Sequence, residues 1–374
     1  MSNVVIIGCG IIGAAIAYEL SQVPGLTITV LDRQAPAQGS TGAALGVLMG
    51  AISHKIKGKA WQMRSFSIQR YTSLIPELEA FTGRQISCNQ QGIVMLCPIG
   101  EDLSKWENLA NIRSAQGWQL EIWDRAKLQS YCPQINCQSN LAAIYSPQDR
   151  QVDPVALTLA LVDAAKRRGV TFHFGETVVN YEITSTESCS TVKQIKTRSH
   201  SLAVDWLVVA AGLGSLQALP SNAALEPPKL DIRPVLGQAI HLRLPGSLGD
   251  RNFQPVITGN DVHIVPCVTG NMPITDYWIG ATVEFSQEQG DIVPDEVKLE
   301  EVRQSAIAFC PALAAATTIK TWSGLRPRPE ARPAPIIEPL TGFSNVLLAT
   351  GHYRNGVLLA PATAQIIRQM IVPS

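Results

Sequence analysis

The sequence predicts an α/β fold in which a Rossmann-like nucleotide-binding domain is interleaved with a second domain built on a mostly antiparallel sheet. A β-α-β pattern with a glycine-rich turn opens the chain. Apolar, strand-like runs far downstream are expected to return to the same sheet. Between these returns, short strand-like pieces are separated by Pro, Gly and Asn. At 374 residues, the chain is also longer than one hydrophobic core usually supports.

The opening β-α-β unit carries the first functional signal. A β-branched run at 3–7 and a second strand expected over 27–31 flank a helix expected over 14–21. The turn between the first strand and the helix has the pattern GxGxxG at 8–13, which permits a tight turn and close approach of a pyrophosphate to the helix N-terminus. Asp32 closes the second strand, where a ribose hydroxyl would be bound. The unit predicts dinucleotide binding.

Three later segments are expected to complete the nucleotide-binding domain. The run 39–50, GSTGAALGVLMG, consists largely of small and hydroxyl residues, which let backbone N–H groups approach a phosphate and a planar ring. A helix capped by Asp153 leads into a strand-turn-strand pattern at 170–183, which brings Val178 toward an adenine. The run 205–214 predicts a buried strand followed by another glycine turn. The predicted nucleotide-binding domain comprises 1–85, 145–220 and 321–374, and the second domain comprises 86–144 and 221–320.

The bulk composition narrows the function. Lys plus Arg and Asp plus Glu number 30 each, so there is no overall basic field to attract nucleic acid. The eight cysteines include no CxxC and no His at metal spacing, which predicts neither a metal site nor a disulfide framework and favours reduced thiols in the cytoplasm. The apolar opening lacks a basic start and is shorter than a membrane span, so neither a signal peptide nor a transmembrane segment is expected. Small-molecule chemistry is therefore expected.

Two C-terminal motifs make the functional interpretation of the sequence more specific. GLRPRPEARP occupies 324–333, and GHYRNGVLLAPATA occupies 351–364. Together with GCGIIG, STGAALGVL and AAGLG, they resemble the D-amino-acid oxidase superfamily of FAD-dependent oxidoreductases, and most closely its glycine oxidases of the thiamine pathway. The resemblance runs from residue 3 to about residue 368. The C-terminal pair is its specific part, because the N-terminal glycines fit many flavoproteins.

The resemblance implies an FAD-dependent oxidative deamination. A hydride would pass from the α carbon of glycine or another small amino acid or amine to flavin N5, and the imine would hydrolyse to an oxo acid and ammonia. Molecular oxygen would be the acceptor and yield hydrogen peroxide. Relatives with covalent flavin use a cysteine near the stretch that corresponds to 321–326, and this stretch has none, so FAD is expected to be non-covalent. A homo-oligomer is expected by analogy with tetrameric relatives.

The resemblance also implies which side chains meet the substrate. Arg326 matches the family arginine that clamps the substrate carboxylate, and Arg354 matches a second substrate arginine. A guanidinium fork can hold a carboxylate bidentately and so orient the α hydrogen. His263 stands where glycine oxidases usually have a tyrosine, and Val283 replaces a pocket methionine, so the choice of substrate stays open. The cofactor-binding residues expected are Gly8, Gly10, Ile11, Ile12, Gly13, Asp32, Arg33, Ser40, Thr41, Leu45, Gly46, Val47, Val178, Gly212, His352, Tyr353, Arg354, Asn355, Gly356, Val357 and Leu358.

Other functions remain compatible with the sequence. A flavin dehydrogenase could oxidise an amine or hydroxy acid and pass electrons to a quinone or protein acceptor. An NAD-dependent dehydrogenase would share the GxGxxG turn but would leave the two C-terminal motifs unexplained. A non-catalytic flavoprotein has no positive sign in the sequence. Among the remaining charged residues, Arg328 and Arg332 are expected to be solvated, and Glu176 and Glu284 are expected to be solvated strand-end groups rather than catalysts.

Overall fold

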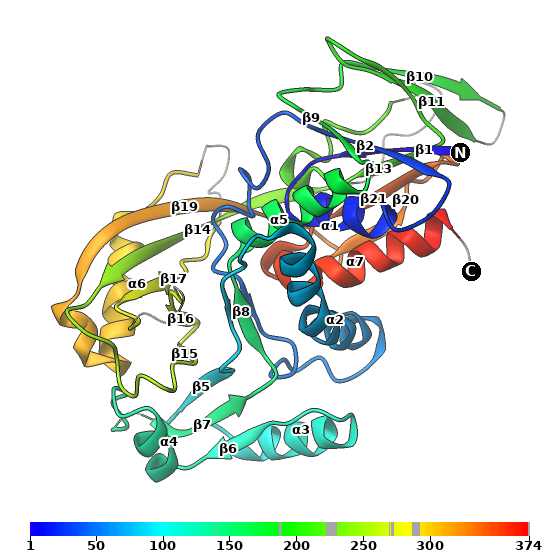
Figure 1. Cartoon of the computed structure of the whole chain (residues 1–374). Helices are drawn as coiled ribbons and strands as arrows, with labels where there is room; N and C mark the ends of the chain where they lie inside the picture. The colour runs from blue at the N-terminus through cyan, green and yellow to red at the C-terminus, as the bar shows by residue number, and fades with distance from the viewer. Residues whose placement is uncertain are drawn as a thin grey trace.

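The computed structural model describes residues 1–138, 140–186, 189–221, 230–268, 270, 273–285 and 292–372 (Figure 1). Its helices, with short 3-10 helices marked η, are α1 (Ile11–Leu20), α2 (Gly58–Thr82), α3 (Leu103–Ala115), α4 (Arg125–Tyr131), α5 (Pro154–Arg167), η1 (Gly212–Gly214), α6 (Glu296–Phe309), η2 (Pro311–Ala315), η3 (Tyr353–Asn355) and α7 (Gly356–Ile371). Its strands are β1 (Ser2–Ile7), β2 (Leu26–Asp32), β3 (Val47–Leu48), β4 (Cys88–Asn89), β5 (Ile93–Pro98), β6 (Glu121–Trp123), β7 (Asn140–Ser146), β8 (Arg150–Val152), β9 (Thr171–Phe174), β10 (Asn180–Ser185), β11 (Ser190–Lys196), β12 (Ser201–Ala203), β13 (Trp206–Val209), β14 (Ile232–Arg243), β15 (Val256–Gly259), β16 (Val262–Pro266), β17 (Asp276–Gly280), β18 (Glu284–Phe285), β19 (Thr317–Pro329), β20 (Ile336–Pro339) and β21 (Val346–Thr350).

A six-stranded sheet forms the nucleotide-binding part, in the order β20-β21-β13-β1-β2-β9. Its strands run parallel, apart from β20 at one edge. Alternate residues of β1 pack on opposite faces, with Val4 and Ile6 against α1, α2, α5 and α7, and Val5 and Ile7 against the small sheet β10-β11-β12. Because both faces are covered, the central strands β1, β13 and β21 are largely apolar, which is why the sequence showed continuous apolar runs there.

A nine-stranded sheet forms the second part of the molecule, in the order β18-β14-β17-β16-β15-β5-β7-β6, with β19 paired to the other edge of β14. Its pairs are antiparallel, except that β5 runs parallel to β15. The long strands β14 and β19 extend from this sheet toward the six-stranded sheet (Figure 1). They therefore carry residues from one part of the molecule to the other.

The mixed α/β fold predicted from the sequence is confirmed. The opening unit agrees closely, although the helix begins at Ile11 rather than at residue 14. Asp153 caps α5 as expected, because its Oδ1 accepts hydrogen bonds from the N–H groups of Val155 and Ala156 at 2.8 and 3.0 Å. The long helix α2 was not foreseen, although Gly83 ends it in a left-handed conformation with φ of 74°.

The predicted division into domains stays a prediction. β19 crosses the expected boundary at residue 321, since it belongs to the nine-stranded sheet from Thr317 onward. Within the second predicted domain, residues 139, 222–229, 269, 271–272 and 286–291 lie outside the described residues. No helix in the described part of the chain is long and apolar enough to cross a membrane.

Helix α2 provides hydrogen-bond partners for the first turns of α7. Pro361 lies inside α7 and has no N–H, so the carbonyl of Val357 lacks its usual helical partner. The buried hydroxyl of Tyr71 on α2 donates to that carbonyl. Ser67 accepts a hydrogen bond from the N–H of Ala362 at 3.3 Å. The first turns of α7 are thereby fixed by a neighbouring helix.

Candidate active site

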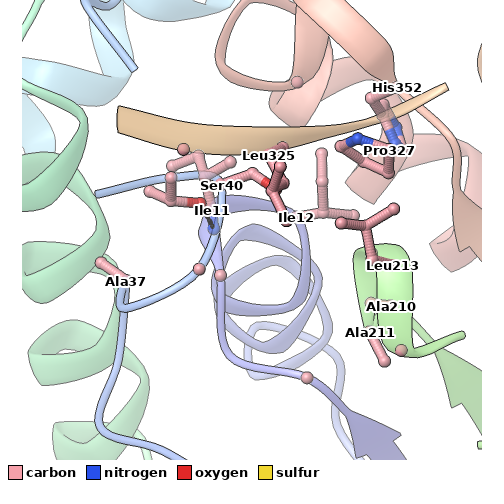
Figure 2. Close-up of a pocket in the computed structure, with 18 of the residues that line it drawn as sticks. Ile11, Ile12, Ala37, Ser40, Ala210, Ala211, Leu213, Leu325, Pro327 and His352 are labelled. Carbon is pink, nitrogen blue, oxygen red and sulfur yellow. Dashed lines mark hydrogen bonds between the residues drawn. The ribbon is translucent and has the colours of Figure 1, made fainter. Parts of the chain in front are cut away.

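A cavity of about 620 Å³ lies at the carboxyl ends of the parallel strands and continues toward the nine-stranded sheet. Its wall includes the ends of β1, β2 and β21, the turn after β13, and the end of β19. Ligands of open parallel sheets bind at this edge. In Figure 2, side chains from α1, from the loop at 37–40, from the turn after β13 and from β19 gather around one space. The cavity is therefore placed to hold a ligand that spans both parts of the molecule.

The glycine turn between β1 and α1 is built by close backbone contacts. Gly8 has φ of 106°, and a Cβ there would lie 2.5 Å from the carbonyl oxygen of Ala210. A Cβ at Gly13 would lie 1.8 Å from the carbonyl oxygen of Gly8. Gly13 thus lets α1 pack against the turn, while the turn itself lines the cavity. The N–H of Ile11 donates to the hydroxyl of Thr41 at 3.0 Å, which joins the turn to the 39–50 segment.

Asp32 stands at the end of β2 on the cavity wall. Its Oδ2 accepts a hydrogen bond from the N–H of Cys9 at 2.6 Å, and its Oδ1 accepts one from the N–H of Gln34 at 2.9 Å. Arg33 is exposed beside it and also lines the cavity. A carboxylate held rigidly by backbone donors is a good acceptor for vicinal hydroxyl groups.

The 39–50 segment packs against β19. Ser40 donates to the carbonyl of Leu325 at 2.6 Å, and the indole N–H of Trp322 donates to the carbonyl of Ala43 at 3.1 Å. A Cβ at Gly324 would lie 2.2 Å from the Cβ of Ala43. The small residues in both segments therefore let the two backbones pack closely together, in addition to leaving room for a ligand. The sequence alone did not indicate that these two segments meet.

Two buried charged side chains fix the backbone that follows this segment. Asp149 accepts hydrogen bonds from the N–H groups of 50–52 at 2.8 Å each. Arg113 donates to the carbonyls of Ala51 and Ser53 at 2.7 Å each, and its guanidinium lies 3.6 Å from the ring centroid of Trp61. Burial raises the pKa of Asp149, and burial lowers the pKa of Arg113 to about 10. Both charges are satisfied by backbone partners, which holds this loop in one shape.

Arg326 brings a cation to the cavity from β19. Its Nη1 donates to the carbonyls of Leu236 and Thr282 at 3.2 and 3.0 Å. Gly237 on the facing strand leaves room for the guanidinium, since a Cβ there would lie 2.1 Å from Nη2. Burial, and then the nearby Arg354, lower the pKa of Arg326. Within the described residues Arg326 has only carbonyl partners and no carboxylate partner, so the anionic group of a ligand can be accommodated there.

Arg354 reaches the same cavity from the turn η3, just before α7. Its Nη2 lies 3.7 Å from Oδ1 of Asp261, which is a loose ion pair. Tyr353, the residue before it, has φ of 52°, an uncommon conformation for a side chain of that size. The turn therefore holds Tyr353 in a backbone conformation that a residue of its size disfavours, and Arg354 follows it directly in the chain.

His263 on β16 also lines the cavity, and its Nδ1 lies 2.9 Å from the hydroxyl of Thr258 on β15. Burial, then Arg354 and Arg326, lower the pKa of His263 to about 4, and Asp261 offsets this only in part. The imidazole is therefore neutral near pH 7. A neutral ring can donate one hydrogen bond without adding a third positive charge beside the arginines.

His352 is buried at the beginning of the C-terminal motif. Its Nε2 lies 2.9 Å from the hydroxyl of Thr363, which in turn donates to the carbonyl of Leu359 at 2.8 Å. Because that hydroxyl proton is already engaged, Nε2 must be the protonated nitrogen. Burial lowers the pKa of His352 to about 3, so the ring is neutral.

A family model described as FAD dependent oxidoreductase matches residues 3–370. The chain belongs to this family. It is 31% identical over 376 residues to the bifunctional protein ThiO/ThiG of Synechocystis sp., a match that covers 99% of this chain and 52% of the relative. The chain thus spans about half the length of the bifunctional relatives it matches. It is 24% identical to a glycine oxidase of Geobacillus kaustophilus, covering 99% of this chain and 92% of the relative. The crystal structure of glycine oxidase from Bacillus cereus superposes with a TM-score of 0.82 at 23% identity, covering 99% of this chain and 95% of that one.

As an FAD-dependent oxidoreductase, the chain needs a site for a dinucleotide, and the described residues fit one. Gly10 offers no side-chain cap to α1, and the hydroxyl of Thr41 engages only the first N–H, that of Ile11, so the other N–H groups of the first turn are available to phosphate. Asp32 fits the ribose hydroxyls, and Val178 lies on the cavity wall, where it fits the adenine. Within the described residues, no group of three or more His, Cys, Asp and Glu side chains could hold a metal ion.

The cavity wall contains the expected site residues with two exceptions. Gly13 packs behind the turn, and Asn355 faces Arg64 of α2, whose Nη2 lies 3.5 Å from its Oδ1. Val283 is also not on the wall, and the cavity is lined instead by Ala281. Wall residues that the sequence reading missed include Gln34, Ala37, Gln38, Thr177, Leu213, Gln217, Ala218, Ala281, Ser323, Leu325 and Pro327.

One expectation about a charged residue is wrong. Glu284 is only 3% exposed, so it is not a solvated strand-end group. It accepts hydrogen bonds from Nε2 of Gln238 at 2.9 Å and from the N–H of Asp295 at 3.3 Å. These donors satisfy the buried carboxylate, which the sequence around β18 did not reveal. Glu176, by contrast, is half-buried and lies on the cavity wall.

Proposed function

We propose that the chain catalyses FAD-dependent oxidative deamination of glycine or another small amino acid or amine. The observation that carries the proposal is the guanidinium of Arg326, which lines the cavity without a carboxylate partner in the described residues. A bidentate guanidinium would bind a substrate carboxylate and restrict how the α carbon is presented. FAD, when bound non-covalently, supplies the hydride acceptor.

The remaining residues of this end would orient the substrate. Arg354 offers a second cationic contact for the carboxylate, and neutral His263 offers a hydrogen-bond donor or acceptor. With its pKa near 4, His263 does not serve as a proton-donating acid near pH 7. Bringing three such groups to one small cavity favours an anionic, polar substrate over an apolar amine.

The test is anaerobic mixing of the FAD-loaded protein with glycine, sarcosine and D-alanine, while flavin absorbance is followed. We expect one of these compounds to bleach the flavin, and peroxide to form on admission of air. Bleaching without peroxide would favour a dehydrogenase that uses another acceptor. A stable flavin spectrum with all three compounds would contradict the proposal.

Three broader features of the proposal rest on the relatives. We propose a cytoplasmic enzyme, an oligomer of identical chains, and a place in thiamine biosynthesis. All three come from the resemblance of the sequence to glycine oxidases of the thiamine pathway, and the relatives named above are a ThiO/ThiG protein and a glycine oxidase. Light scattering of the purified chain would test the oligomer, with a monomer as the contrary outcome.

A further inference from the structure

The hairpin between β15 and β16 carries a carboxylate to the substrate end of the cavity. Its two turn residues have positive φ, 51° at Asn260 and 60° at Asp261, as a tight two-residue hairpin turn requires. The turn places Oδ1 of Asp261 3.7 Å from Nη2 of Arg354. Asp261 comes from the nine-stranded sheet and Arg354 from the loop before α7, so this contact joins the two parts of the molecule.

This carboxylate is well placed to influence ligands without being buried among them. Asp261 is 86% exposed and does not line the cavity, whereas Arg354 and His263 do. Among the described residues, Asp261 is the one carboxylate within ion-pair distance of an arginine that lines the cavity. Its charge is also felt by His263, whose pKa it pushes upward against burial and the two arginines. An anion that enters the cavity and contacts Arg354 must therefore compete with Asp261.

We propose that Asp261 sets the anion selectivity of the site, by lowering its affinity for carboxylates and disfavouring dicarboxylates most. The inference rests on the proposed function, since it assumes that the arginines receive the substrate carboxylate. A monocarboxylate loses part of its attraction to Arg354 while Asp261 is paired with it. A dianion carries a second negative charge into the same field and is repelled further. The site thus takes a small monocarboxylate amino acid in preference to a dicarboxylate.

The test compares the FAD-loaded wild type with D261N. Asparagine accepts positive φ readily, so the hairpin turn is preserved. Acetate and malonate are titrated separately, and binding is read from the perturbation of flavin absorbance. We expect D261N to bind acetate about two- to fivefold more tightly, as suits an exposed charge pair, and to gain more for malonate. The gain should shrink at about 1 M salt, where screening acts within about 3 Å.

Two further variants identify the cause. E107Q on α3 removes one negative charge outside the cavity wall and should leave both affinities unchanged. In an R354Q background, D261N should give a smaller gain, because the competition for Arg354 is gone. With a substrate that the enzyme turns over, D261N should lower KM and leave kcat nearly unchanged.

The outcomes separate this inference from the proposed function. Unchanged or weaker acetate binding in D261N, with binding to the wild type still dependent on Arg326, would overturn only the role of Asp261. An equal gain for acetate and malonate would overturn the selectivity. If neither anion perturbs the flavin of the wild type, both the selectivity and the carboxylate site at Arg326 are overturned.

Discussion

The two ends of the cavity are lined by different kinds of chemical groups. At the nucleotide end, the wall includes backbone groups at a glycine turn, the N-terminus of α1, and the carboxylates of Asp32 and Glu176. At the other end, which we propose receives the substrate and call the substrate end, charged and polar side chains converge from β16, β19 and the turn before α7. A backbone-built end depends on local sequence, whereas a side-chain-built end depends on which distant elements meet. The backbone-built end therefore tolerates few substitutions. The side-chain-built end can change its ligand through single side-chain replacements.

The largest expected effect comes from breaking the backbone-built end. G8A puts a Cβ 2.5 Å from the carbonyl of Ala210 at a residue with φ of 106°. Strain and overlap should weaken FAD binding by about a hundredfold or more, which a fluorescence titration of the apoprotein would measure. G25A, also at positive φ but with open space around the new Cβ, is the matched control. FAD affinity equal to that of G25A would contradict the geometry.

Acid should destabilise the protein through a group between the two ends. Burial lowers the pKa of His352 from 6.5 to about 3, so the unfolded chain binds a proton in that range before the folded chain does. Stability from this group is complete above about pH 6.5 and is lost as the pH falls toward 3. The full loss is on the order of 5 kcal/mol, since each pKa unit corresponds to about 1.4 kcal/mol, and it is measurable by urea unfolding at several pH values. H352Q should flatten this part of the profile, and an unchanged slope would show that the ring is not buried in neutral form.

Replacing one cation should break the side-chain-built end alone. R326Q removes the guanidinium that we expect to bind carboxylate, and KM should rise by one to two orders of magnitude, since charge-assisted hydrogen bonds contribute about 1.5–3 kcal/mol. FAD affinity should stay close to that of the wild type. R328Q, whose arginine pairs with Glu330 at 3.1 Å, is the neighbouring control and should behave like the wild type. Similar KM values for both variants would exclude Arg326 as the carboxylate-binding residue.

A smaller effect, on the free energy of unfolding, is expected from a substitution in α2 behind the cavity wall. Y71F leaves the carbonyl of Val357 buried without its donor, which should cost about 1–3 kcal/mol of unfolding free energy. Thermal unfolding would measure this loss. Restoring the helix N–H with P361A in the same chain should recover much of it, because the carbonyl then has a partner in α7. No recovery in the double variant would mean that Tyr71 acts through packing.

The contrast also explains what the sequence could predict. GxGxxG and Asp32 predicted the nucleotide end because their spacing is local and its physical demands are strict. Arg326 and Arg354 were found by family resemblance and not by pattern, because nothing in the spacing brings β19 and η3 together. The contact of Ser40 with Leu325 joins residues 285 positions apart and left no local sign in the sequence. Glu284 was misjudged because burial of a charge depends on donors that fold in from elsewhere, here Gln238 and Asp295.

The bond between Tyr71 and the carbonyl of Val357 has a consequence for how such chains diverge. Proline at 361 destabilises the fold less while the hydroxyl of Tyr71 stands opposite it on α2, so the two positions are expected to be inherited together. A lineage that replaces Pro361 frees position 71 to drift, while one that first loses the hydroxyl meets a less stable intermediate. The order of mutations is thereby constrained, and paired change at 71 and 361 is the trace it would leave among descendants.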